Sequence, residues 1–99
     1  MKTNLAINTN LCIYERVVTP QANIRIAYKL LQGKQAEGSE YSILITFSGG
    51  TDSDEILLED VSRDKTCGLA LLEILADGEV DPCSAPYIIE ELLCQDEFL

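Results

Sequence analysis

The sequence has no histidine and no tryptophan, and it holds one methionine and three prolines in 99 residues. The absence of histidine removes the commonest general base and metal ligand, and it excludes serine–histidine and cysteine–histidine catalytic pairs. Basic side chains are also scarce, because seven lysines and arginines stand against 17 aspartates and glutamates and leave a net charge of −10. Such a charge repels phosphate backbones, so direct binding of DNA or RNA is not expected. We expect a protein that is not an enzyme and needs no cofactor.

Long apolar runs are missing too. None approaches the ~18 residues that a membrane span needs, and the first ten residues lack the apolar core of a signal peptide. We therefore expect a cytoplasmic protein without membrane attachment, in which residues 1–10 form a flexible arm. Thiols stay reduced in that compartment, and no Cys-x-x-Cys spacing indicates a metal site. The cysteines expected to act as small apolar packing residues are Cys12, Cys67, Cys83 and Cys94.

The apolar content of 46% is sufficient for a single domain over residues 1–99. Alternation of apolar and polar residues predicts up to four strands. These strands cover Leu11 to Thr19, Asn23 to Gln32, Tyr41 to Phe47 and, with less regular alternation, Asp54 to Val61. The polar stretch from Gly33 to Glu40 predicts an exposed loop.

Two helices are expected after the strands. Ser62 is the predicted N-cap of the first, which runs to about Asp77 and stops at Gly78, a residue suited to a left-handed cap. The second starts after Ser84, with Pro86 tolerated in its first turn. Its predicted core stripe is Ile88, Ile89, Leu92 and Leu93, and its opposite side carries Tyr87, Cys94 and Phe98.

This order of elements predicts an α+β fold, a three- to four-stranded antiparallel meander with two C-terminal helices packed on one face. The face that the helices leave open would carry Arg25 and Lys29 together with Arg16. We therefore expect a dipolar molecule with a basic sheet face and an acidic helical side.

Charge is distributed unevenly along the chain. Residues 1–50 carry three acidic and five basic side chains, residues 51–99 carry fourteen acidic and two basic, and no basic residue follows Lys65. A negative surface without counter-charge attracts a basic partner over long range, although it also serves solubility alone. The predicted partner-binding residues are Glu73, Asp77, Glu79, Asp81, Glu90 and Glu91, together with the apolar side chains of Tyr87 and Phe98.

A glycine-rich segment supports a different hypothesis. It follows an apolar strand, resembles the pyrophosphate loop of ATP pyrophosphatases, and consists of Ser48, Gly49, Gly50, Asp52 and Ser53 around Thr51. That loop requires a strand, the loop and a helix in a large parallel sheet, whereas here an acidic stretch follows. The residues Gly-Gly-Thr-Asp are also common in hairpin turns, and we favour a hairpin turn as the interpretation of this segment. Asp52, Asp54 and Glu55 lack the spacing of a calcium loop, so no metal site is predicted.

Short sequence segments between about residue 40 and residue 99 resemble a small Firmicutes family of unknown function. The matching segments are Tyr41-Ser42-Ile43, Glu59 to Ser62 with Asp64 and Lys65, Leu71-Leu72 with Glu79 to Pro82, and Ile88 to Leu93. The chain differs from that family at Ser42, where glycine is usual, and in a less acidic ending after Glu91. The resemblance implies no activity, and it implies a variable hairpin turn around residues 48–54.

Three hypotheses about function follow. The first is a non-enzymatic module whose acidic side docks on a basic, nucleic-acid-binding protein, as an inhibitor in the manner of small acidic anti-CRISPR proteins. The second is a nucleotide-binding protein that uses the glycine-rich segment. The third is a regulatory or structural module that self-associates, as a homodimer, through its open sheet or through the strip around Tyr87.

Overall fold

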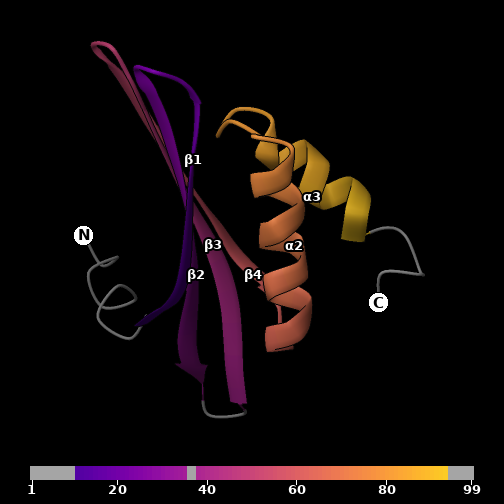
Figure 1. Cartoon of the computed structure of the whole chain (residues 1–99). Coiled ribbons are helices and arrows are strands. Elements are labelled where there is room, and N and C mark those ends of the chain that lie inside the picture. The colour runs from indigo at the N-terminus through magenta and orange to yellow at the C-terminus, as the bar shows by residue number, and fades with distance from the viewer. Residues whose placement is uncertain (1–10, 36–37, 94–99) are drawn as a thin grey trace.

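The computed structural model describes residues 11–35 and 38–93. Four antiparallel strands form one sheet in the order β1-β2-β3-β4, and two helices follow them (Figure 1). The elements are β1 (Leu11–Gln21), β2 (Ile24–Gln35), β3 (Gly38–Gly49), β4 (Asp52–Ser62), α2 (Lys65–Asp77) and α3 (Ala85–Leu93). The predicted α+β meander with two C-terminal helices is confirmed.

Both helices lie on the same face of the sheet (Figure 1). Alternation along the central strands explains why, because alternate side chains point to that face. The buried ones among them are Ile26, Tyr28 and Leu30 of β2 and Tyr41, Ile43 and Ile45 of β3. The fully buried side chains of the core are Tyr28, Leu30, Ile43, Ile45, Leu71, Leu72 and Leu75. Gly68 of α2 permits close packing here, since a Cβ atom on it would lie 3.2 Å from Cδ1 of Leu30.

The predicted loop from Gly33 to Glu40 is wrong in extent. Strands β2 and β3 stay paired as far as Gln35 and Gly38, so they form one long hairpin. Polar composition indicated exposure, but a hairpin needs only its backbone hydrogen bonds and tolerates polar side chains. Residues 36–37 lie outside the described part of the chain.

The first helix begins two residues later than predicted. Its N-cap is Asp64, whose Oδ2 accepts a hydrogen bond from the Cys67 N–H at 3.0 Å. Ser62 instead stabilises the turn that leads into the helix, because its Oγ accepts a hydrogen bond from the Asp64 N–H at 2.9 Å. Both residues are good caps, and the end of β4 at Ser62 decides between them.

The end of α2 is set by Glu79 rather than by a left-handed Gly78. Gly78 has a right-handed φ of −87°, whereas Glu79 has a φ of 52°. The Glu79 N–H donates to the Ala76 carbonyl and the Val80 N–H to the Leu75 carbonyl, both at 3.0 Å. These bonds form a Schellman motif with a non-glycine residue in its left-handed position.

The start of α3 agrees with the prediction, because α3 begins at Ala85, after Ser84, and carries Pro86 in its first turn. Ile89 is buried, and Ile88 and Leu92 pack against the core as expected. Tyr87 is 74% exposed. The side chain of Leu93, and Cys94 and Phe98, lie outside the described residues, as do residues 1–10.

The cysteines are free where they are described. Cys67 packs against the core, but Cys12 and Cys83 are exposed, so the packing role predicted for those two is wrong. Within residues 11–35 and 38–93, no group of three histidine, cysteine or acidic side chains could hold a metal ion. No helix in the same ranges is long and apolar enough to cross a membrane.

Ser42, one of the positions at which the chain differs from the resembled family, has a structural role. Strand β4 bulges opposite it, and Asp60 in this bulge has a φ of 55°. The buried Ser42 Oγ accepts a hydrogen bond from the Asp60 N–H at 3.0 Å. A glycine could not supply this acceptor, so the serine stabilises the bulge in this chain.

Candidate functional site

The acidic side of α2 faces an arginine from the sheet. Arg16 of β1 pairs in register with Tyr28, so it points toward the helices and not onto the open face as expected. Its Nη1 forms an ion pair with Glu73, and a second with the Asp77 Oδ1 at 2.8 Å. The expectation that Glu73 and Asp77 have no nearby basic residue is therefore wrong.

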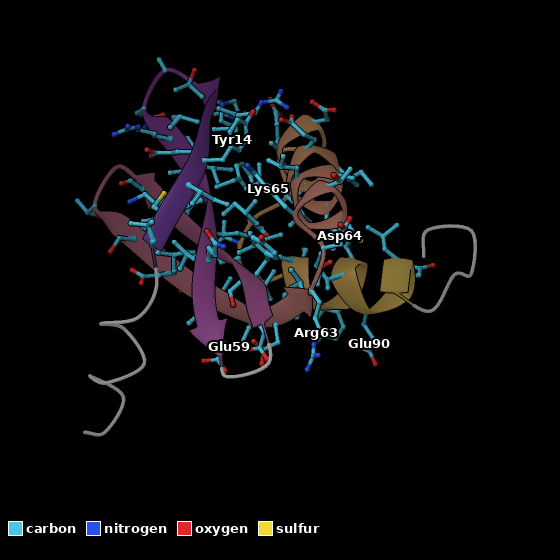
Figure 2. The ribbon with its side chains drawn as sticks, turned by 90° about the horizontal axis from the view of Figure 1, so that it is seen from below. Tyr14, Glu59, Arg63, Asp64, Lys65 and Glu90 are labelled. Atoms are coloured by element: carbon cyan, nitrogen blue, oxygen red, sulfur yellow. The ribbon has the colours of Figure 1, made fainter. Side chains whose placement is uncertain are left out.

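Tyr14 completes this contact, which we call the β1–α2 junction (Tyr14, Arg16, Glu73 and Asp77). The Tyr14 hydroxyl donates to the Glu73 Oε2 at 2.6 Å, and Figure 2 shows Tyr14 between β1 and α2. Hydrogen bonds from Tyr14 and then from Arg16 lower the pKa of Glu73 below its usual value. The same bond to Glu73 raises the pKa of Tyr14. In the junction, the carboxylates of Glu73 and Asp77 are therefore paired with a cation of the same molecule.

Other acidic residues meet at a hollow of about 320 Å³ between the β3–β4 hairpin and the connection from α2 to α3. We call it the acidic cleft, and its lining residues are Phe47, Asp52, Ser53, Asp54, Asp81, Pro82 and Cys83. Three carboxylates and two apolar side chains line it, and no lysine or arginine does. The carboxylates of the cleft therefore have no basic side chain among its lining residues.

The β3–β4 hairpin brings two of the carboxylates to the cleft. A two-residue turn at Gly50 and Thr51, with a φ of +59° at Gly50, sets the register. Asp54 therefore pairs with Phe47, which packs against the core. Asp52 lies two residues away and shares that side of the strand, because side chains alternate along it.

Asp81 is held in place from the core. The hydroxyl of the buried Tyr28 donates to the Val80 carbonyl at 2.8 Å, which fixes the residue before Asp81. The Asp81 Oδ1 then accepts from the Ser84 N–H at 3.0 Å and orders the approach to α3. Burial, followed by the negative charges of Glu79 and Asp81, raises the pKa of Tyr28 to about 12. The negative charges of Glu79 and Asp81 therefore affect the ionisation of a tyrosine in the core.

The glycine-rich segment forms a hairpin, as favoured. Gly49 pairs with Asp52 across the turn, and β4 follows instead of a helix. The Gly50 N–H is used within the protein, since it donates to the Asn23 carbonyl at 3.3 Å. A phosphate at this loop would also lie near the carboxylates of Asp52 and Asp54. These features weigh against the nucleotide hypothesis.

The remaining predicted partner-binding residues lie apart from the cleft. Glu90 and Glu91 are exposed on α3, and Figure 2 shows Glu90 projecting away from α2. The structure thus joins Asp81, and Glu79 two residues before it, to Asp52 of the predicted loop. Sequence reasoning did not place Asp54 with the candidate site residues, although its two-residue spacing from Asp52 on a strand indicated a shared face.

Comparison with known proteins finds no match to this chain among family models, curated proteins or solved structures. The resemblance to a Firmicutes family of unknown function stays a prediction. Inference about function therefore rests on the junction and the cleft themselves.

Proposed function

We propose that this protein is a non-enzymatic interaction module whose acidic cleft binds a basic segment of a partner protein. The observation that carries the proposal is the composition of the cleft, in which Asp52, Asp54 and Asp81 gather around apolar side chains without any lysine or arginine. A cleft of this kind accepts the charged head of a lysine or arginine at its carboxylates. The aliphatic stem of that side chain packs on Phe47 and Pro82.

The charge of the whole chain supports the same partner. At a net charge of −10, the protein attracts a basic surface over long range and speeds the encounter. Glu79 adds to the field beside the cleft, and Glu90 and Glu91 extend it along α3. Glu73 and Asp77 do not belong to the docking surface, because both carboxylates already pair with Arg16, which reduces their combined charge from −2 to −1.

The same chemistry supports an inhibitory role. A partner whose basic surface normally holds a phosphate backbone cannot hold this protein and the nucleic acid on that surface together. In this respect the proposal follows the small acidic anti-CRISPR proteins, which resemble nucleic acid in charge.

A labelled arginine-rich peptide tests the cleft directly, with fluorescence anisotropy read at several salt concentrations. Asp52→Lys should weaken binding about tenfold, because it places a positive charge among the carboxylates. Glu59→Lys is the matched control, since it makes the same change of net charge at an exposed position of β4 outside the cleft. It should weaken binding by no more than about twofold. Equal losses in the two variants would show that only net charge matters, and the docking proposal would fail.

Two exposed cysteines provide a second measurement on the unaltered protein. Cys83 lines the cleft and Cys12 lies on β1 outside it. Bound peptide should slow alkylation of Cys83 and leave that of Cys12 unchanged, as read by peptide mass spectrometry. Equal protection of both thiols, or of neither, would contradict binding in the cleft.

A further inference from the structure

The face of the sheet opposite the helices is uncovered in the described part of the chain (Figure 1). We call it the open face, the side that carries Arg25, Ala27 and Lys29 of β2. Two large apolar side chains, Val17 and Leu57, remain 38% exposed at its outer strands. Leu57 pairs in register with Leu44 of β3, which shares its side of the sheet, so apolar surface extends to the centre of this face.

A depression of about 200 Å³ lies on this face. Ala27 and Thr46, neighbours in register, contribute short side chains to it, and Arg25 and Lys29 stand on either side of Ala27 along β2. No ion pair to Arg25 or to Lys29 occurs within the described part of the chain. Glu15 of β1, which pairs in register with Lys29, lines the same depression. The depression therefore presents two positive charges from β2 and one carboxylate from β1 around a shallow centre, so its net positive charge suits one further carboxylate.

The open face also carries a carboxylate in the position to fill such a depression. Glu55 of β4 pairs with Thr46, which pairs with Ala27, so the three residues form one row across the sheet. Glu55 and Ala27 stand at equal distances on the two sides of β3. A two-fold axis that runs along β3, between two sheets placed face to face, carries Glu55 onto Ala27.

We propose that a second copy of this chain binds the open face through this two-fold axis. Glu55 of each copy then enters the depression of the other copy, between its Arg25 and Lys29, and the contact occurs twice by symmetry. Leu44 lies one row away on β3 and meets Leu44 of the partner subunit on the axis, while Leu57 covers the stem of the partner's Lys29. The arrangement is an aligned packing of two sheets.

Charge favours a second copy as the occupant. The rows centred on Ala27 hold the cations Arg25 and Lys29 and the anions Glu15 and Glu55, so this part of the surface is locally neutral in a chain of net charge −10. Two copies therefore approach with least repulsion at this face. An axis along β3 lays β2, β3 and β4 of one copy over β4, β3 and β2 of the other, which covers roughly 550 Å² per partner, the size of a weak interface.

A charge-swap experiment tests the proposal by sedimentation velocity, from micromolar to submillimolar concentration. The wild-type chain should dimerise in a concentration-dependent manner. Glu55→Lys should weaken the dimer about tenfold or more, since it sets like charges against Arg25 and Lys29, and the double variant Arg25→Glu/Lys29→Glu should do the same against Glu55. An equimolar mixture of the two variants should dimerise again, because both symmetry-related contacts then join opposite charges.

Asp54→Lys is the matched control, because it makes the same change of charge one residue away on the other side of β4. It should leave the dimer unchanged within about twofold, and circular dichroism should show every variant folded. A wild-type chain that stays monomeric at submillimolar concentration would overturn the proposal. Variants that do not recover on mixing would overturn it as well. Neither result bears on peptide binding in the acidic cleft, which lies on the helix side of the sheet.

Discussion

Acidic residues are paired with an arginine in the β1–α2 junction, whereas those of the acidic cleft have no basic side chain beside them in its lining. In the junction, Arg16 pairs with Glu73 and Asp77, and Tyr14 adds a hydrogen bond. In the cleft, Asp52 and Asp81 have no cation beside them among the lining residues. The first arrangement attaches a strand to a helix, and the second leaves negative charge for the partner that we propose.

The difference teaches that a count of acidic residues does not locate a docking surface. Asp77 and Asp81 are four residues apart in the chain, yet Asp77 pairs with an arginine and Asp81 has no cation among the residues that line its cleft. The register of β1 decides this, because it places Arg16 opposite Tyr28 and thus on the helix side. Substitutions at each region should separate the two roles.

The largest effect is expected at Tyr28, which fixes the wall of the cleft. Tyr28→Phe leaves the Val80 carbonyl without its hydrogen bond and should lower the free energy of unfolding by about 1–2 kcal/mol near neutral pH. Urea denaturation of the variant and the wild type measures the difference. Unchanged stability would show that this bond does not hold the connection from α2 to α3.

The pH dependence of stability should reveal the same residue. The pKa of Tyr28 is about 12 in the folded chain against 10.0 for an unperturbed tyrosine, so folding favours the protonated form. Its contribution is complete below about pH 10 and is lost as the pH rises to about 12, a change of about 2–3 kcal/mol. Tyr28→Phe should lose less stability over this range than the wild type does, as measured by denaturation at each pH.

A smaller effect is expected at Asp81, where charge and capping can be separated. Asp81→Ala removes the acceptor for the Ser84 N–H and should cost about 1 kcal/mol of stability. Asp81→Asn keeps an acceptor and should cost little, while it removes a carboxylate from the cleft. Both variants should bind the arginine-rich peptide more weakly, and only the alanine variant should melt earlier. Normal peptide binding by Asp81→Asn would remove Asp81 from the proposed site.

The end of α2 offers a test of nearly equal size. Glu79→Gly should stabilise the chain by about 0.5–1 kcal/mol, because it relieves a left-handed conformation at φ 52°. Gly78→Ala should be close to neutral, since φ is −87° and the added Cβ would make only ordinary van der Waals contacts, to the Val80 Cγ2 at 3.4 Å and to the carbonyl oxygens of Ile74 and Leu75 at 3.5 and 4.0 Å. Thermal melting compares the two variants. Strong destabilisation by Gly78→Ala would instead place the left-handed residue at Gly78.

The smallest effect is expected in the junction, which is exposed to solvent. Since the pKa of Glu73 is lowered, its pairing contributes stability above the usual glutamate pKa and loses that contribution as the pH falls through the lowered value. Tyr14→Phe should move the Glu73 midpoint upward, because the Tyr14 hydrogen bond is the largest cause of the shift. A carboxylate titration by nuclear magnetic resonance reads this midpoint. An unchanged midpoint would mean that Arg16 alone lowers it.

The sequence by itself determined the class of the fold. Two-residue alternation from Ile24 to Leu30 specified a half-buried strand, and Ser84 with Pro86 specified the start of the last helix. These features are local, because side chains on one strand face or helix turn interact with near neighbours and with water. The excess of acidic over basic residues in the second half of the chain also follows from the sequence without a structure.

Only the tertiary structure decided where charge is free. Arg16 and Glu73 are 57 residues apart and meet because α2 packs on the sheet, a contact that neither local pattern contains. The cleft likewise joins the β3–β4 hairpin to the connection after α2. Even the cap at Glu79 depended on tertiary packing, since Val80 must reach the core and Tyr28 must reach its carbonyl. Electrostatic contacts act through space, so their partners follow from packing and register rather than from position along the chain.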